Sequence, residues 1–236
     1  GAGNFGTTYL VEKGNSQFAL KLIRENMLAS GKDDARRIER EIRILKSVNS
    51  DLVSKYVDDG FFQDGEEKYR FIVMEYVNGI NLDSYLKRNQ SLSIDTASKL
   101  ALSIFESVND IHKSGIIHRD LKPSNIILTN SDTFEVKILD FGISKLIDAS
   151  TLTTTGQGMG KFAYMAPEQL KSAKDIDYRA DYYSIGAMLY EFLSGEKPLK
   201  MSNQLEAMYK IINEQPEPIT NKVSNIPIEL SKLVET

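Results

Sequence analysis

The hydrophobic pattern of this chain changes once along its length, and this change constrains the fold more than any other feature. In the first third, short runs rich in β-branched and aromatic residues alternate with turn residues, as in strands. From Leu82 onward, apolar residues recur every three or four positions, as in helices. We therefore expect an α+β protein with a small β-rich lobe at residues 1–76, a connection at residues 77–80 and a larger helical lobe at residues 81–236.

Individual elements follow from the same pattern. In the small lobe we expect one helix, about Asp34 to Val48, and four strands. In the large lobe, a long amphipathic helix is predicted from Ser93 to Ser114, and Asp181 to Leu193 is apolar nearly all round, which indicates a helix buried within the lobe. The expected strands are Thr7 to Glu12, Gln17 to Ile23, Tyr56 to Phe62 and Tyr69 to Met74.

Composition excludes several classes of protein. The 236 residues are 41% hydrophobic and 26% charged, which is typical of a globular chain, and a net charge of -4 provides no basic surface for nucleic acid. Cysteine is absent, which rules out a disulfide framework, a thiol nucleophile or a cysteine zinc site and is compatible with the cytosol. No apolar stretch approaches the roughly 18 residues of a membrane span, so an anchor would have to lie outside this chain.

One short stretch concentrates groups that carry chemistry. His118-Arg119-Asp120-Leu121-Lys122-Pro123-Ser124-Asn125 is followed fifteen residues after its end by Asp140-Phe141-Gly142. The strand-like runs at residues 126–128 and 136–139 flank a turn-rich segment and predict a hairpin. Since a hairpin brings its outer ends together, Asn125 and Asp140 should lie side by side, offering an amide oxygen and a carboxylate to a hard cation such as Mg2+.

These motifs, together with Ala166-Pro167-Glu168, resemble the signature set of the eukaryotic-type protein kinases. The resemblance implies that Asp120 orients a substrate hydroxyl and accepts its proton, that Lys122 neutralises the transferring phosphate, and that Asn125 and Asp140 hold the metal ions. A polar loop before a hairpin is the plainer interpretation, but it explains neither the full octapeptide nor the spacing of the second motif.

The first six residues fit a glycine-rich phosphate loop. Gly1-Ala2-Gly3-Asn4-Phe5-Gly6 matches the pattern G-x-G-x-x-G, in which backbone N–H groups approach phosphate oxygens closely. By itself this spacing indicates a flexible turn equally well. A strand is expected after it, whereas a dinucleotide-binding fingerprint or a P-loop requires a helix there, so the kinase-like loop over ATP is the interpretation that fits.

A lysine and a glutamate complete the expected nucleotide side. Lys21 lies in an otherwise apolar strand with Ala19 and resembles the lysine that contacts the α- and β-phosphates. In isolation it could simply extend its amine from a strand face. Glu41, however, shares a helical stripe with Ile38 and Leu45, and a carboxylate on an inward face needs a counter-ion. Lys21 is the expected partner, which is also the ion pair implied by the resemblance.

Met74-Glu75-Tyr76-Val77 resembles the segment whose backbone binds adenine, with Met74 as the gatekeeper. The alternative is a buried strand that runs into a turn. Asn81 stands where many kinases carry an acidic ribose contact, so that contact is carried over only in part.

A hydroxyl-rich loop precedes the Ala166-Pro167-Glu168 motif. In kinases of this kind an arginine at the position of Arg119 receives a phosphate from such a loop, which predicts phosphorylation at one of four residues; a plain solvated loop is the alternative. The candidates are Thr151, Thr153, Thr154 and Thr155.

Lys122 resembles the serine/threonine class, but Lys161 occupies the position of a usual threonine, where its ammonium could pair with Asp120. The chain also begins at the glycine loop and ends at Thr236, before expected late helices, so we expect both ends to be truncated. The sequence predicts Mg2+- and ATP-dependent phosphorylation of serine or threonine in protein substrates. The alternatives are a pseudokinase or nucleotide-binding scaffold and a small-molecule phosphotransferase of kinase-like fold.

Overall fold

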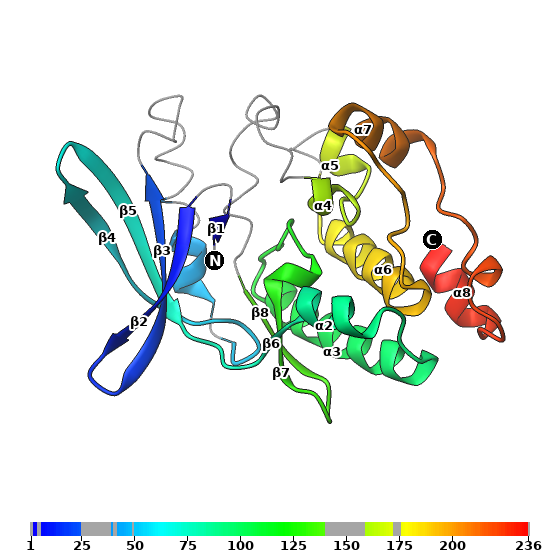
Figure 1. Ribbon diagram of the computed structural model, residues 1–236, viewed down its shortest axis with the longest axis horizontal. Coiled ribbons are helices and arrows are strands. Elements are labelled where there is room, and N and C mark those ends of the chain that lie inside the picture. The colour runs from blue at the N-terminus through cyan, green and yellow to red at the C-terminus, as the bar shows by residue number, and fades with distance from the viewer. Residues whose placement is uncertain are drawn as a thin grey trace.

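The computed structural model describes residues 2–3, 6–24, 39, 42–48, 50–139, 159–171 and 176–235. A β-sheet forms one part of the molecule and a helical bundle with a small second sheet forms the other, as Figure 1 shows. The predicted α+β class with a β-rich first part is therefore confirmed. Within the described ranges, none of the helices combines the length and hydropathy that crossing a membrane would require.

The first sheet is antiparallel throughout its five strands. Its spatial order is β1-β2-β3-β5-β4, so that β3 lies at the centre. Gly14 and Gly65 occupy the turns of the two long hairpins with positive φ angles of 62° and 59°, which glycine adopts without steric cost. All four strands expected in this region are confirmed. The strands are β1 (Ala2–Gly3), β2 (Gly6–Lys13), β3 (Ser16–Arg24), β4 (Tyr56–Asp64) and β5 (Glu67–Glu75).

A helix packs against this sheet, and its described residues, 39 and 42–47, belong to the helix expected to end at Val48. Ile42 and Leu45 are both 3% exposed and belong to the main hydrophobic core. Its polar side is tied to β4, where Lys46 Nζ lies 2.7 Å from the carboxylate of Asp59.

The second sheet is built around the predicted hairpin. Its strands β6 (Ile80–Asn81), β7 (Ile126–Asn130) and β8 (Glu135–Ile138) are antiparallel neighbours in that order. Strand β6 therefore begins at the last residue of the expected connection. The division of the chain into lobes at residues 76 and 81 stays a prediction.

Helices make up most of the remaining chain. Ser93 caps α3 by accepting a hydrogen bond from the Thr96 amide at 3.1 Å, and the glycine after α6, Gly195, has the left-handed conformation (φ 73°) that commonly ends a helix. Both long helices predicted from the sequence are confirmed. The helices are α2 (Leu82–Asn89), α3 (Ile94–Lys113), α4 (Met159–Phe162), α5 (Glu168–Lys171), α6 (Arg179–Ser194), α7 (Gln204–Asn213) and α8 (Ile228–Glu235), with 3-10 turns at Pro123–Asn125 and Ile219–Asn221.

Helix α6 lies in the middle of the helical part, between α3 and α8 (Figure 1). Its largest fully buried side chains, Tyr190 and Phe192, are 1% and 0% exposed. Burying an aromatic side chain of this kind contributes about 2 kcal/mol or more to folding. The helix therefore provides a fixed support for the loops that contact it.

Candidate active site

The loop that carries Asp120 is anchored on a carboxylate at the start of α6. Asp181 is fully buried, and its two oxygens accept hydrogen bonds from the backbone N–H groups of His118 at 2.8 Å and Arg119 at 2.7 Å. His112 on α3 lies 2.8 Å from the same carboxylate. Three segments of the chain thus converge on one side chain.

Burial acts to raise the pKa of Asp181. The hydrogen bond with His112, the nearby ring of His118 and the two backbone N–H groups outweigh it, so the pKa lies below the ordinary value. Asp181 is therefore ionised at neutral pH and holds the loop through charge-assisted hydrogen bonds.

Sequence reasoning missed Asp181 because it treated the helix around it as simply apolar. The signal was present: a carboxylate on a helix that is buried nearly all round needs partners. The argument that predicts a counter-ion for Glu41 also predicts partners for Asp181.

His118 connects the loop with the second sheet. Its Nε2 atom lies 3.0 Å from the carbonyl oxygen of Leu139, and its Nδ1 atom accepts a hydrogen bond from the Asp120 amide at 3.3 Å. The Asp120 backbone is therefore held from the side of β8 as well as from α6.

The predicted hairpin ends where the sequence argument required. Ile126 pairs with Ile138, and the Leu139 N–H donates to the carbonyl oxygen of Asn125 at 2.8 Å. Asp140, the next residue, lies outside the described residues. Its expected approach to Asn125 is supported by this hydrogen bond and stays a prediction.

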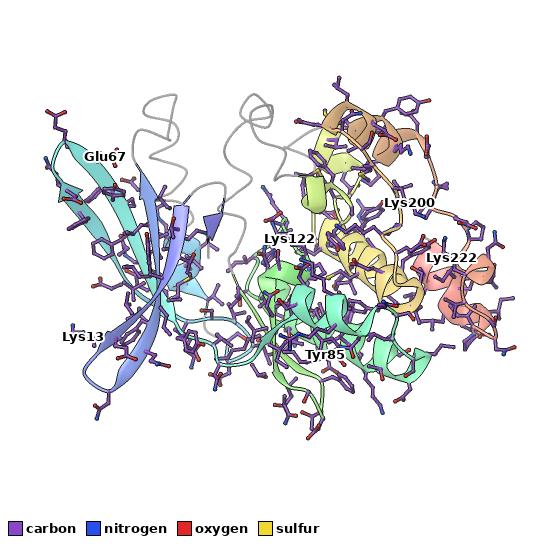
Figure 2. All side chains as sticks on the ribbon, in the orientation of Figure 1. Lys13, Glu67, Tyr85, Lys122, Lys200 and Lys222 are labelled. Atoms are coloured by element: carbon purple, nitrogen blue, oxygen red, sulfur yellow. The ribbon has the colours of Figure 1, made fainter. Side chains whose placement is uncertain are left out.

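Three of the predicted site residues come together. Asp120 is 7% exposed, and its Oδ2 atom accepts hydrogen bonds from Lys122 Nζ at 2.8 Å and from Asn125 Nδ2 at 3.3 Å. Asn125 Nδ2 also donates to the Asp120 carbonyl oxygen at 2.8 Å. Lys122, labelled in Figure 2, lies on the side of the helical part that faces the first sheet.

The orientation of the Asn125 amide follows from these contacts. A backbone carbonyl can only accept a hydrogen bond, so the amide nitrogen must point toward Asp120. The amide oxygen is then the atom left for a cation, and oxygen is the ligand that Mg2+ prefers. Among the residues described, no three carboxylate or histidine side chains converge on a metal site, and the second expected ligand, Asp140, is outside them.

Lys21 lies on the central strand of the first sheet. It is half-buried and pairs with Thr8 on β2 and Ile72 on β5. Ala19 is two residues away on the same face of β3 and pairs with Met74, which is 5% exposed. The strand register thus places Ala19, Lys21 and Met74 on neighbouring positions of one sheet.

The segment after Met74 leads from the first sheet to the second. The Glu75 N–H donates to the Lys55 carbonyl at 2.8 Å, and the Glu75 carboxylate pairs with Lys137 on β8 at 2.5 Å. No hydrogen bond of the Val77 backbone to another described residue is found. Val77 is therefore the better candidate than Glu75 to offer both backbone groups to a ligand.

Asn81 has a structural role in this fold. Its amide oxygen caps α2 by accepting from the Asp83 N–H at 3.2 Å, and its amide nitrogen donates to the Ser124 carbonyl at 2.9 Å. A sugar contact by this side chain would have to compete with both hydrogen bonds.

The glycine-rich segment is described only in part, and most of the remaining expectations fall on residues that the structure does not describe. Ala2–Gly3 pairs with Gly6 and Thr7, and the strand that follows the glycines, β2, confirms that no helix starts there. The candidate site residues that lie outside the described ranges are Gly1, Asn4, Phe5, Glu41, Asp140, Thr151, Thr153, Thr154 and Thr155, together with the side chains of Ala2 and Lys161.

Comparisons with known proteins agree with this geometry. The model of the protein kinase domain family matches residues 1–236. A probable serine/threonine-protein kinase of Clostridium perfringens is 34% identical over 220 residues, which cover 93% of this chain and 31% of the relative. The serine/threonine-protein kinase PknA of Mycobacterium tuberculosis is 35% identical over 218 residues, covering 92% of this chain and 49% of PknA.

A crystal structure of Rad53 1-466 in complex with AMP-PNP superimposes with a TM-score of 0.67 and 29% identity, covering 90% of this chain and 51% of the other. This chain spans less than half the length of the two curated relatives described above. The family match nevertheless extends over all of its residues. The chain therefore belongs to the protein kinase domain family, and the curated relatives that it resembles are named serine/threonine-protein kinases.

Proposed function

We propose that this domain transfers the γ-phosphate of ATP to serine or threonine hydroxyls of protein substrates with the help of Mg2+. The observation that carries the proposal is the arrangement of Asp120, Lys122 and Asn125. The carboxylate of Asp120 is within hydrogen-bonding distance of both other side chains. The carboxylate of Asp120, the ammonium of Lys122 and the amide of Asn125 are thus neighbours and could serve as base, cation and metal ligand.

In the proposed reaction the substrate hydroxyl oxygen attacks the γ-phosphorus, and the bond from that phosphorus to the bridging oxygen of ADP breaks. The hydroxyl proton passes to the Asp120 carboxylate, while Lys122 offsets negative charge on the transferring group. Asn125 and Asp140 would hold Mg2+, which when bound would neutralise charge on the phosphates. Positioning and electrostatics are expected to supply most of the rate enhancement.

ATP is assigned to the side of the first sheet. Lys21, held by Glu41, would contact the α- and β-phosphates under the glycine-rich loop of residues 1–6. Ala19, Met74 and the backbone of Val77 would surround the adenine. The register of β3 against β5 supports this assignment, and the Rad53 relative was crystallised with the ATP analogue AMP-PNP.

The central test is Asp120→Asn, which keeps the shape of the side chain but removes the proton acceptor. Turnover should fall about 10^2- to 10^4-fold, the usual range for losing a general base, while ATP affinity is retained. Steady-state kinetics and a nucleotide titration measure the two quantities. Wild-type turnover in this variant would refute the assigned role.

The acceptor is tested with purified protein, labelled ATP, Mg2+ and a generic protein substrate, followed by phosphoamino-acid analysis. Label in serine or threonine supports the proposal. Label in a small molecule would favour a small-molecule phosphotransferase, no label would favour a pseudokinase, and phosphotyrosine would show that Lys122 does not indicate the acceptor class.

Regulation by phosphorylation is proposed for Thr151, Thr153, Thr154 or Thr155, with Arg119 receiving the phosphate. Mass spectrometry of active and phosphatase-treated protein would identify the site, and equal activity of both forms would contradict the proposal.

A cytoplasmic location is proposed from the absence of cysteine and the expected use of ATP. Cell fractionation would test it.

A further inference from the structure

The side chain of Gln169 bridges two segments that are fifty residues apart. Its Nε2 atom donates a hydrogen bond to the carbonyl oxygen of Arg119 at 2.9 Å. Its Oε1 atom accepts one from the Ala166 N–H at 3.0 Å. Gln169 therefore joins the loop that carries Asp120 to the Ala166–Glu168 segment at the start of α5.

The contact of the Gln169 amide oxygen with Ala166 has a local explanation. The Gln169 N–H donates to the carbonyl oxygen of Ala166 at 3.0 Å while its side chain accepts from the amide of the same residue. Counted from Ala166 as the capping residue, Pro167 is the first residue of the turn that leads into α5 and Gln169 is the third, the position from which a side chain reaches back to cap the first turn. Glutamate serves in this position as well as glutamine because only an acceptor is needed.

The amide nitrogen of Gln169 has no such local role, because it donates to the carbonyl oxygen of Arg119, the residue directly before Asp120. Arg119 has a φ angle of 65°, a left-handed conformation that costs a non-glycine residue about 1 to 2 kcal/mol. Its N–H is held by Asp181 at 2.7 Å, and its C=O by Gln169. Both polar backbone groups of this strained residue are thus fixed by side chains from other parts of the fold.

The peptide group that contains the Arg119 carbonyl also contains the Asp120 N–H, which donates to His118 Nδ1 at 3.3 Å. A rotation of that peptide plane would break the bonds to Gln169 and His118 together. It would also change the direction in which the Asp120 side chain leaves the backbone.

We propose that Gln169 is a positioning residue for Asp120. By donating to the Arg119 carbonyl, it holds the peptide plane before the base and couples that plane to the Ala166–Glu168 segment. This inference rests on the proposed function, in which Asp120 accepts the substrate proton.

The decisive variant is Gln169→Glu. It keeps the acceptor that caps α5, removes the donor, and places a carboxylate against the Arg119 carbonyl oxygen. We expect kcat to fall about 10-fold, since misplacement of a catalytic group by about 1 Å can cost up to about 10^2-fold. KM for ATP should stay within about twofold and Tm should be retained, because the cap persists.

Two further variants separate the roles. Gln169→Lys supplies a donor without the capping acceptor, so it should retain more of kcat than Gln169→Glu while lowering Tm. Gln63→Glu is the matched control, because Gln63 also donates to a backbone carbonyl, that of Gly65 at 3.1 Å, in the distant β4–β5 turn. It should leave kcat unchanged.

A second measurement does not depend on activity. Hydrogen exchange of the nucleotide-free protein should show faster exchange of the Arg119 and Asp120 amides in Gln169→Glu than in the wild type. Wild-type kcat or unchanged exchange in this variant would overturn the proposal and leave Gln169 as a helix cap. If the wild-type domain phosphorylates nothing, the proposed function fails, and the exchange result still decides the positioning role.

Discussion

Helix α6 carries a fully buried carboxylate, Asp181, in its first turn and a half-buried one, Glu191, in its last, and the surroundings shift the two pKa values in opposite directions. Asp181 accepts hydrogen bonds from two backbone N–H groups and lies beside His112, and its pKa is lowered. Glu191 accepts a hydrogen bond from the Tyr164 hydroxyl at 2.5 Å, and burial raises its pKa despite that bond.

The two pKa values shift in opposite directions because Asp181 and Glu191 differ in the number and kind of their hydrogen-bond donors. Backbone N–H groups and the positive end of the helix dipole surround Asp181. Glu191 lies near the negative end of the same helix, and Asp83 raises its pKa further while Lys197 lowers it. A buried carboxylate is therefore favourable where the fold supplies fixed donors, and this condition is met at the end of α6 that holds the loop with Asp120.

Replacing Asp181 should have the largest effect on the free energy of unfolding. Asp181→Asn loses the charge and places an amide N–H against a backbone N–H, so we expect a loss of about 3 kcal/mol in the free energy of unfolding. Urea denaturation at pH 7 measures it. Because the folded pKa is depressed, the stabilisation is present at neutral pH and is lost below about pH 4, so the difference between variant and wild type should shrink there.

The control is Asp177→Asn, since Asp177 precedes the same helix but pairs with Arg179 at the surface. Surface ion pairs contribute little to stability, so this variant should unfold like the wild type. An equal loss in both variants would show that the start of α6 is sensitive to any change of charge.

Replacing Glu191 should change the free energy of unfolding less, and should raise it. Glu191→Gln keeps an oxygen for the Tyr164 hydroxyl and removes the charge of this half-buried side chain, so the free energy of unfolding at pH 7 should rise by about 0.5 kcal/mol. The effect is small because solvent screens a partly exposed charge.

The sign of the pH dependence follows from the raised pKa of Glu191. A raised folded pKa means that the wild type loses stability as the pH rises from about 4.5 through that pKa. The advantage of Glu191→Gln should therefore appear as the pH rises and vanish in acid. A variant less stable than the wild type at pH 7 would mean that the ionised Glu191 is stabilising.

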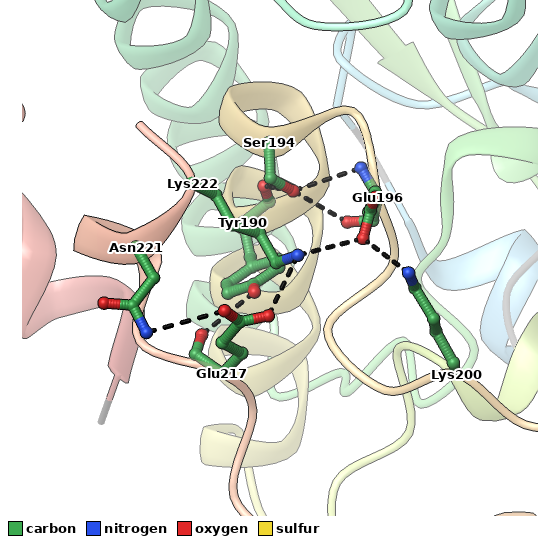
Figure 3. Close-up of polar contacts among 7 residues, drawn as sticks. All are labelled: Tyr190, Ser194, Glu196, Lys200, Glu217, Asn221 and Lys222. Atoms are coloured by element: carbon green, nitrogen blue, oxygen red, sulfur yellow. Dashed lines mark hydrogen bonds and ion pairs between the residues drawn. The ribbon is translucent and has the colours of Figure 1, made fainter. Parts of the chain in front are cut away.

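The smallest effect is expected from the ion pairs beyond the last turn of α6. Figure 3 shows Lys222 between Glu196 and Glu217. Its Nζ atom lies 3.1 Å from the Glu196 carboxylate and 3.0 Å from that of Glu217, and Lys200 Nζ lies 3.0 Å from the Glu196 carboxylate. Replacing Lys222 with Met should lower Tm only slightly at low salt. The difference should disappear at high salt, because exposed pairs are screened. A loss that persists in salt would indicate that Lys222 stabilises the fold through packing rather than charge.

Much of the fold could be predicted because its elements have strong local signals. The alternating runs predicted β2, β3, β4 and β5, and the apolar stripe of Ser93 to Ser114 predicted α3 with Ser93 as its cap. The hairpin of β7 and β8 was also predicted, since a turn-rich segment between two short apolar runs has few other solutions.

The residues that hold the site in place could not be predicted from local sequence patterns. Gln169 and Asp181 act on Arg119 across fifty and sixty-two residues, and neither spacing leaves a local pattern in the sequence. The capping role of Asn81 was likewise hidden, because its second partner, Ser124, is forty-three residues away.

The amino-acid sequence was sufficient to indicate which chemical groups this protein has and in which elements they lie, namely the acid, lysine and amide of residues 120–125 and the lysine of β3. Local periodicity and short motifs were sufficient for that. How Asp120 is held, through Asp181, His118 and Gln169, depends on contacts between distant parts of the fold. The reason is physical: the strained backbone at Arg119 persists only where distant side chains satisfy both of its polar groups.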